Sequence, residues 1–121
     1  MKNCLLLLAG FSFGVLGTSC VYHDEETLYP PPPCDTAQVT YSLSVAPILQ
    51  QNCYECHGGE ATISGIPLEG YDNLIAADPT RVIGAIRHRD GLVPMPKDRD
   101  PLDECDIRKI EIWVAEGAQN N

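Results

Sequence analysis

The sequence predicts an all-α fold made of short helices and loops. No stretch of the chain alternates apolar and polar residues over several positions, which is the pattern of a half-buried strand. Apolar residues instead recur three or four positions apart in short segments, as they do on one face of a helix. Glycines and prolines, ten of each in 121 residues, separate these segments. We therefore expect short helices that are joined by irregular loops.

The first helix is predicted to begin at Val45, with Ser44 as its N-terminal cap. Pro47 then falls in the first turn, where proline is tolerated. One face of this helix carries the residues that share helical spacing: Val45, Ile48, Leu49 and Asn52. A loop rich in glycine follows over 58–67, and residues 71–77 are predicted to form a second short helix.

Two later helices have strong start signals. Asp78 followed by Pro79 combines a capping carboxylate with a proline at the first helical position. The apolar stripe of this helix consists of Val82, Ile83 and Ile86. Residues 91–101 are predicted to form an irregular loop that contains three prolines. The last helix is predicted to begin after the cap Asp103, and the residues that share its apolar face are Ile107, Ile110, Trp113, Val114 and Gly117.

Residues 1–19 are predicted to be an export signal rather than part of the fold. Lys2 gives a positive start, and the 13 residues 4–16 are almost wholly apolar. A membrane-spanning helix needs about 20 apolar residues, so this shorter run is typical of a signal peptide. The small residues before Cys20 resemble the end of a bacterial lipoprotein signal, although Gly17 stands where leucine is usual. The resemblance implies a lipid on Cys20 after cleavage. An ordinary signal peptide that is cleaved nearby is the alternative.

Residues 20–37 are predicted to be an acidic, proline-rich tether. Residues 23–26 are charged, and residues 30–33 are consecutive prolines, which favour an extended polyproline spacer. Residues 38–121 remain for the folded domain. A domain of this size buries a limited apolar core, so we expect a disulfide, metal or cofactor to stabilise it.

Cys53, Cys56 and His57 form a C-x-x-C-H sequence, which is the attachment signature of c-type haem. Residues three apart lie on one side of a helical turn, so both thiols can reach the vinyl groups at one edge of a porphyrin. The histidine can then bind the iron through one ring nitrogen. A structural zinc site would instead combine the two thiolates with Cys34 and either Cys105 or His57. A plain disulfide within the motif would leave His57 without a role, and a thioredoxin-like motif would need a βαβ context that the sequence lacks.

Residues 40–119 resemble the small mono-haem cytochromes c. The matching features occur in the expected order: a helix that leads into the C-x-x-C-H sequence, Gly58-Gly59, Ile66-Pro67-Leu68, Met95 between two prolines, and a last helix that contains Ile110, Trp113 and Val114. The resemblance implies a cytochrome c-like fold of short helices and loops around one haem c. In such a fold the haem is bound covalently to Cys53 and Cys56.

The same resemblance implies further roles around the haem. Pro67, Leu68 and Trp113 would pack against the ring, and a backbone carbonyl near Ile66 would accept the second N–H of His57. The candidates to bind the haem propionates are Arg81, Arg87, Arg89, Tyr71 and Trp113. Exposure of the arginines to solvent and packing of the aromatic residues in the core are simpler interpretations of these five side chains.

Met95 is the predicted second axial ligand of the iron, opposite His57. It is the one methionine that remains after removal of the signal peptide, and it lies between Pro94 and Pro96, which restrict the backbone of the loop. Thioether ligation raises the reduction potential and suits an electron carrier. The alternatives are His88 as the ligand, or a five-coordinate iron that would suit a sensor or a peroxidase-like site.

Cys34 and Cys105 remain once the other cysteines have been assigned. Because an exported protein meets an oxidising compartment, we expect them to form a disulfide. Closure of so long a loop stabilises the fold by about 4 kcal/mol in the chain-entropy treatment. Many small cytochromes c lack such a bridge, so the family resemblance does not imply it.

The sequence therefore predicts a one-electron carrier rather than an enzyme. No Ser/His/Asp arrangement and no phosphate-binding loop is present in it. Seventeen acidic against eight basic residues argue against nucleic-acid binding and favour redox partners with a basic docking face. We expect a monomer in the bacterial cell envelope, lipid-anchored on the periplasmic side or at the outer-membrane surface. A haem sensor and a colourless interaction domain held by zinc or a disulfide are the alternatives.

Overall fold

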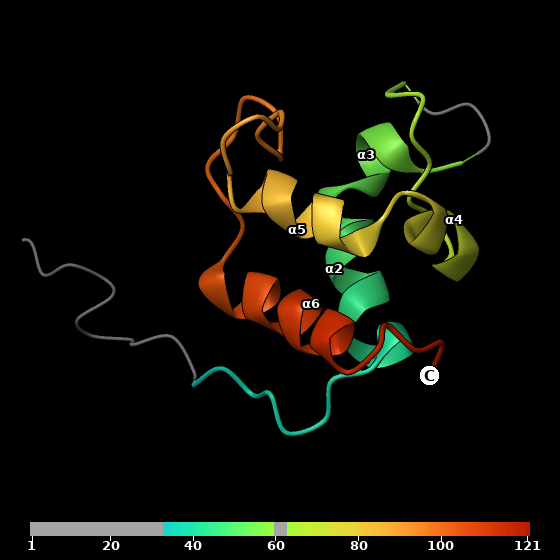
Figure 1. Ribbon diagram of the computed structural model, residues 1–121, viewed down its shortest axis with the longest axis vertical. Helices are drawn as coiled ribbons and strands as arrows, with labels where there is room; N and C mark the ends of the chain where they lie inside the picture. The colour runs from blue at the N-terminus through green and yellow to red at the C-terminus, as the bar shows by residue number, and fades with distance from the viewer. Residues whose placement is uncertain (1–32, 60–62) are drawn as a thin grey trace, which may run out of the picture. The chain divides into compact units, whose positions relative to one another are not determined.

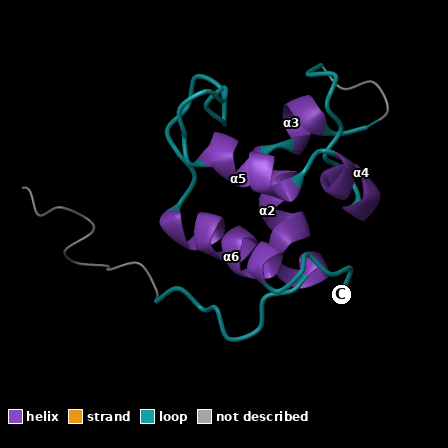
Figure 2. Ribbon diagram, in the orientation of Figure 1, coloured by secondary structure: helices purple, strands orange, loops and turns teal. Residues whose placement is uncertain are grey.

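Helices and loops account for the whole of the chain that the computed structural model describes, which is residues 33–59 and 63–121 (Figures 1 and 2). Neither range contains a strand, and the predicted all-α class is confirmed for them. No helix in these ranges is long and apolar enough to cross a membrane. The predicted signal peptide 1–19, the lipidated Cys20 and the tether as far as residue 32 lie outside the described residues.

The first helical segment begins earlier than the sequence predicts. A π-helical turn, η1 (Tyr41–Val45), leads directly into α2 (Ala46–Asn52). Its cap is Thr40, whose hydroxyl oxygen accepts a hydrogen bond of 3.1 Å from the backbone N–H of Leu43. Ser44, the predicted cap, already lies inside the helical segment because Thr40 offers the same capping hydroxyl one turn earlier. Pro47 does lie in the first turn of α2, as predicted.

Three later helices begin close to the predicted positions: α4 (Tyr71–Ala76), α5 (Pro79–Ile86) and α6 (Glu104–Ala115). A short helix for which no bounds were predicted, α3 (Tyr54–His57), precedes them. The carboxylate of Asp78 caps α5 by accepting a hydrogen bond of 3.0 Å from the N–H of Thr80. The carboxylate of Asp103 caps α6 in the same way, at 2.8 Å from the N–H of Cys105. Both predicted start signals are therefore confirmed, because a capping side chain satisfies an N–H that the helix itself leaves unpaired.

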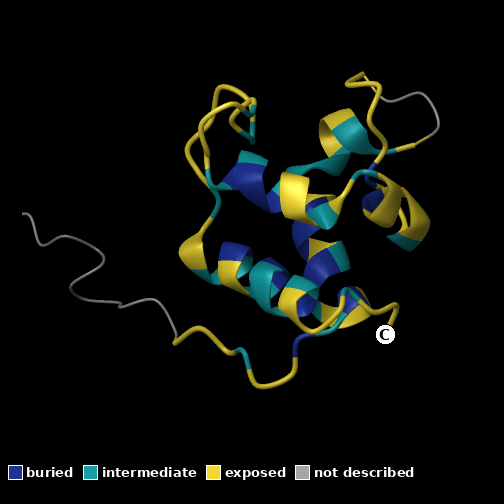
Figure 3. Cartoon of the chain, viewed as in Figure 1, coloured by how far each residue is buried: buried dark blue, intermediate teal, exposed yellow. Residues whose placement is uncertain are grey.

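The core is built from the apolar faces of η1, α2, α5 and α6 (Figure 3). The buried side chains that these four elements contribute are Tyr41, Val45, Ile48, Leu49, Ile83, Ile86, Ile107, Ile110 and Trp113. Trp113 is 1% exposed, and its ring centroid lies 5.8 Å from that of Tyr41 and 6.4 Å from that of Tyr71. Its indole N–H donates a hydrogen bond of 2.8 Å to the carbonyl of Gln119. The aromatic contacts thus fix α6 against the first helical segment.

Two long-range links tie the ends of the described chain to the core. A disulfide joins Cys34 to Cys105 in the first turn of α6. At the other end, the carbonyl of Asn121 accepts a hydrogen bond of 2.9 Å from the N–H of Ser42. The side-chain oxygen of Asn121 accepts another, of 2.8 Å, from the N–H of Tyr41. N–H groups at the start of η1 are therefore satisfied by the C-terminal residue.

Candidate functional site

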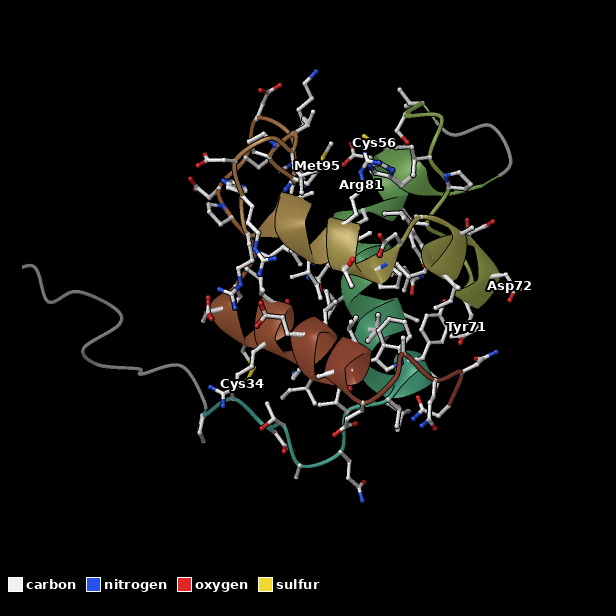
Figure 4. All side chains as sticks on the ribbon, viewed as in Figure 1. Cys34, Cys56, Tyr71, Asp72, Arg81 and Met95 are labelled. Carbon is white, nitrogen blue, oxygen red and sulfur yellow. A yellow bond between two sulfur atoms is a disulfide. The ribbon has the colours of Figure 1, made fainter. Side chains whose placement is uncertain are left out.

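A cavity of about 480 Å³ lies between α3, α5 and the loop that connects α5 to α6. We call this loop, residues 87–103, the ligand loop. The volume lies within the range of about 300–1,000 Å³ that is common for small-molecule and cofactor sites. Figure 4 shows Cys56, Arg81 and Met95 near one another at one end of the domain, and Cys34 at the other. The apolar side chains that line the cavity are Ile63, Ile66, Leu68, Ala77, Val82, Ala85, Ile86, Leu92, Val93, Met95, Pro96 and Leu102.

Both thiols of the C-x-x-C-H sequence line this cavity. Cys53 ends α2 and is half-buried, whereas Cys56 lies in α3 and is exposed, and neither belongs to a disulfide. The alternative of a plain disulfide within the motif is therefore not what the structure contains. Burial raises the pKa of the Cys53 thiol to about 11, because removal from water disfavours the thiolate.

His57 lines the cavity with its ring held by the loop that follows the motif. Its Nδ1 lies 2.8 Å from the carbonyl oxygen of Ile66 and 2.8 Å from the hydroxyl of Ser64. A carbonyl can only accept, so Nδ1 carries the proton in this arrangement. The Ser64 hydroxyl donates to the same carbonyl at 3.2 Å. In the neutral ring Nε2 is then left unprotonated, with a lone pair that can bind a metal.

Met95 reaches the same cavity from the ligand loop. Its side chain is half-buried, and its backbone N–H donates a hydrogen bond of 3.0 Å to the carbonyl of Ala85 in α5. His88, the alternative ligand, is exposed and is not among the described residues that line the cavity. Its ring Nε2 instead lies 3.1 Å from the carbonyl oxygen of Met95. The structure thus brings the sulfur-bearing residue, and not the second histidine, to the cavity.

The charged lining of the cavity is mainly cationic. Arg81, Lys97 and Arg99 contribute to it, whereas Glu55 is the one acidic side chain among the described lining residues. Arg99 donates a hydrogen bond of 2.7 Å to the Glu55 carboxylate and so links the ligand loop to α3. This local excess of positive charge contrasts with a chain whose formal net charge is −9.

Lys97 and Arg99 are site residues that sequence reasoning missed. They alternate with acidic residues in the order Lys97, Asp98, Arg99, Asp100, so the segment carries no net charge that would mark it. Ser64 was missed as well, because its contact with His57 depends on how the loop folds back. Proximity of Lys97 and Arg99 to Met95 in the sequence is the signal that points to them.

Most of the predicted propionate ligands lie elsewhere. Arg81 lines the cavity, but Arg87 forms ion pairs with Glu104 at 2.6 Å and Glu111 at 2.9 Å. These contacts hold α5 against α6. The hydroxyl of Tyr71 donates a hydrogen bond of 2.8 Å to the carbonyl of Ala118. Arg89 and Trp113 are likewise absent from the described lining of the cavity.

Two predicted haem-packing residues also lie away from the cavity. Leu68 lines the cavity and is 6% exposed. Pro67 borders a separate hollow with Gly59 and Glu69. Trp113 is in the core between α6 and η1, because its indole ring pairs with aromatic neighbours there. The placement of Pro67 and Trp113 therefore differs from the sequence prediction.

The predicted zinc alternative draws on Cys34 and Cys105, which the structure joins in a disulfide with an S–S distance of 2.02 Å. Disulfide sulfurs are not the thiolates that zinc requires. In residues 33–59 and 63–121, no three His, Cys, Asp or Glu side chains are grouped so that they could hold a metal ion. The thiols of Cys53 and Cys56 therefore lack the additional thiolate from Cys34 or Cys105 that the zinc alternative requires.

The chemical character of the site comes from four side chains and from the charge around them. Two thiols, an imidazole held at Nδ1 and a thioether line one apolar cavity with a cationic rim. No model of a protein family matches the chain, and no curated protein or solved structure matches it either.

Proposed function

We propose that this protein is a one-electron carrier that holds a single c-type haem in the cavity between α3, α5 and the ligand loop. The observation that carries the proposal is that Cys53, Cys56, His57 and Met95 line one cavity, although Met95 is remote from the other three in the sequence. The same proposal includes a cytochrome c-like arrangement of the short helices around that haem.

The residues present fit a haem in three respects. The cavity has a mainly apolar lining, which suits a large aromatic ring. The two cysteines line it, so that their thiols would be available for thioether bonds to the ring. Arg81, Lys97 and Arg99 supply positive charge for the two propionates, which are carboxylates. The cationic lining is thus accounted for by the anionic groups of the proposed cofactor.

The chain's own residues would prepare the iron site. The hydrogen bond from Nδ1 of His57 to the Ile66 carbonyl orients the ring and keeps the lone pair on Nε2. Met95 would supply the second axial ligand from a loop that is fixed to α5. The apolar lining, with Leu68 buried beside it, would exclude water from the iron. When bound, haem supplies a reversible one-electron couple between ferrous and ferric iron.

The proposal includes a protein partner and a place in the cell. The lipid on Cys20 would attach the chain to a membrane of the bacterial cell envelope, and the excess of seventeen acidic over eight basic residues favours a redox partner with a basic docking face. The association rate should then fall as salt rises, because salt screens attraction between exposed charges. A rate that is independent of ionic strength would contradict this choice of partner.

An absorption spectrum tests the proposal. The protein is expressed with haem-maturation machinery, and spectra are recorded in the oxidised and the reduced state. We expect covalently bound haem, sharp reduced c-type bands and a weak long-wavelength band from sulfur-to-iron charge transfer. Cys53→Ser together with Cys56→Ser should abolish covalent attachment.

Two variants of the ligand loop test the assignment of Met95. Met95→Leu should remove the sulfur band and let carbon monoxide bind rapidly, whereas Asp90→Asn, at an exposed position of the same loop that does not line the cavity, should retain the band. Covalent haem without a sulfur band in the wild-type protein would contradict the Met95 ligation and favour a sensor or peroxidase-like site. A colourless, well-folded protein would contradict the haem proposal and lead to zinc analysis.

A further inference from the structure

Two contacts fix the ligand loop to α5, and a third, within the loop, joins its first residues to Met95. The N–H of Met95 donates to the carbonyl of Ala85 at 3.0 Å. The side chain of Leu92 packs directly over Gly84, whose missing side chain leaves the space that a Leu92 methyl group occupies. The third contact is made by His88, whose ring Nε2 lies 3.1 Å from the carbonyl oxygen of Met95. Because a carbonyl can only accept, Nε2 of His88 donates this hydrogen bond.

His88 adopts a backbone conformation that is uncommon for residues other than glycine. Its φ of 51° lies in the left-handed region, directly after the C-cap of α5, where glycine is the usual residue. For a residue with a side chain this conformation costs of the order of 1 kcal/mol. An unfavourable backbone that the surrounding structure maintains is grounds for a functional hypothesis. The residue with this unfavourable backbone, His88, is also the one whose side chain contacts Met95.

We propose that His88 is a positioning residue for Met95, and this inference rests on the proposed function. With Ala85 holding the N–H and His88 holding the carbonyl, both backbone polar groups of Met95 are held by residues at or just beyond the C-terminal end of α5. The thioether can then move only through its side-chain torsions. His88 thus acts on the iron site through Met95 and does not itself bind the iron.

Loss of the His88 hydrogen bond should therefore make Met95 easier to displace. An external ligand of ferric iron binds only when the methionine has left, so its apparent affinity follows the population of that open state. Removal of one hydrogen bond of ordinary strength should raise that population several-fold to tenfold, where tenfold corresponds to about 1.4 kcal/mol.

The experiment measures cyanide binding to the ferric, haem-loaded full chain by absorption. His88→Leu removes the donor, and His88→Gln keeps an N–H at a similar distance from the backbone. Leucine and glutamine are equally unsuited to a positive φ, so this pair separates the hydrogen bond from the backbone strain. We expect cyanide affinity to rise several-fold to tenfold in His88→Leu and to stay within about twofold of wild type in His88→Gln.

A glycine variant separates positioning from overall stability. His88→Gly removes the hydrogen bond but suits the left-handed backbone. We therefore expect a melting temperature at or above that of wild type, together with cyanide affinity raised as in His88→Leu. Amide hydrogen exchange in a peptide that contains Met95 should also become faster in both variants.

The outcomes are distinguishable. If the wild-type protein contains haem but lacks the sulfur band, Met95 is not the ligand, and the proposed function fails together with this inference. If the band is present and cyanide affinity is unchanged in His88→Leu, the proposed function stands and the positioning role is overturned. The role is also overturned if His88→Gln behaves like His88→Leu.

Discussion

The two thiols of the C-x-x-C-H sequence are equivalent in the motif but not in their surroundings. Burial raises the pKa of Cys53 to about 11, whereas Cys56 is exposed. The thiolate is the form that reacts with alkylating reagents, and it accumulates above the pKa. In the protein without haem, we therefore expect iodoacetamide at pH 8 to modify Cys56 well before Cys53. Mass spectrometry of the two labelled positions over time measures both rates.

The pH dependence of this labelling provides a control. As the pH rises from 8 to about 11, the rate at Cys53 should increase steeply because its thiolate becomes populated. The raised pKa also means that the folded state retains a proton that the unfolded state loses. The stabilisation is complete below the ordinary value of 9.0 and disappears as the pH rises towards about 11. Equal labelling of both cysteines at pH 8 would contradict this difference in burial.

At the residue scale, local motifs could be predicted and long-range neighbours could not. The C-x-x-C-H residues lie within five positions, so helical spacing alone places them together. The contact between Ser64 and His57 and the contact between Arg99 and Glu55 depend on loops that fold back from elsewhere. His88 is ambiguous in the sequence for the same reason. A histidine next to arginines gives no indication of which carbonyl it meets.

At the scale of elements, the position of the ligand loop depends on Gly84 in α5. Alanine is the better helix former by about 1 kcal/mol, so Gly84→Ala would stabilise an isolated helix. In this fold the added methyl group meets the side chain of Leu92, which must move. We expect the clash to outweigh the helix propensity and to lower the free energy of unfolding by about 1 kcal/mol, as overpacking typically does.

A double variant tests that interpretation. Leu92→Ala removes the side chain that the new methyl group meets, so Gly84→Ala should be neutral or stabilising in a Leu92→Ala background. Denaturant unfolding of the four proteins in this cycle isolates the interaction between the two sites. Equal effects of Gly84→Ala in both backgrounds would show that Leu92 is not the obstacle.

The contact between α5 and α6 depends on Arg87, which pairs with two carboxylates. The side chain of Glu111 is 33% exposed and that of Glu104 is 73% exposed, so solvent screens the second pair more. We expect Glu111→Gln to lower the free energy of unfolding by about 0.5–1 kcal/mol at neutral pH, and Glu104→Gln to lower it less. Urea unfolding of the two variants measures the difference.

Acid should abolish the difference in stability between the wild-type protein and Glu111→Gln. The Arg87 guanidinium holds the pKa of the Glu111 carboxyl below its ordinary value of 4.5. The stabilisation is therefore complete above pH 4.5 and is lost as the pH falls through the lower value in the folded protein. The wild-type protein and Glu111→Gln should become equally stable in acid. If the difference in free energy of unfolding between the two proteins did not change with pH, the ion pair with Arg87 would not be its cause.

Among the elements, the starts of the two helices with a capping carboxylate were predicted correctly, whereas the start of the first helix was predicted one turn too late. Asp78 and Asp103 each cap a helix through a contact that spans two residues, which the sequence displays directly. At the first helix both Thr40 and Ser44 offer a hydroxyl. The choice between them depends on Tyr41, which is buried against Trp113 and draws the helical segment one turn towards the N-terminus.

At the scale of the whole molecule, the Cys34–Cys105 disulfide spans 71 residues. Cross-links that close long loops restrict the unfolded chain most, so Cys34→Ala with Cys105→Ala should lower the free energy of unfolding by about 2–4 kcal/mol. Guanidinium unfolding with and without a thiol reductant provides the measurement. Reductant should destabilise the wild-type protein and leave the double variant unchanged. If the haem is attached as proposed, its spectrum should be the same in both proteins.

The same disulfide determines how the protein carries a mechanical load. Every described residue that lines the cavity lies between positions 52 and 102, inside the loop that the disulfide closes. A pull from the proposed lipid anchor that is opposed at the C-terminus enters at Cys34 and passes through the sulfur–sulfur bond to Cys105. Residues 35–104 are then not extended. We therefore expect the cavity to keep its shape under tension that straightens the tether.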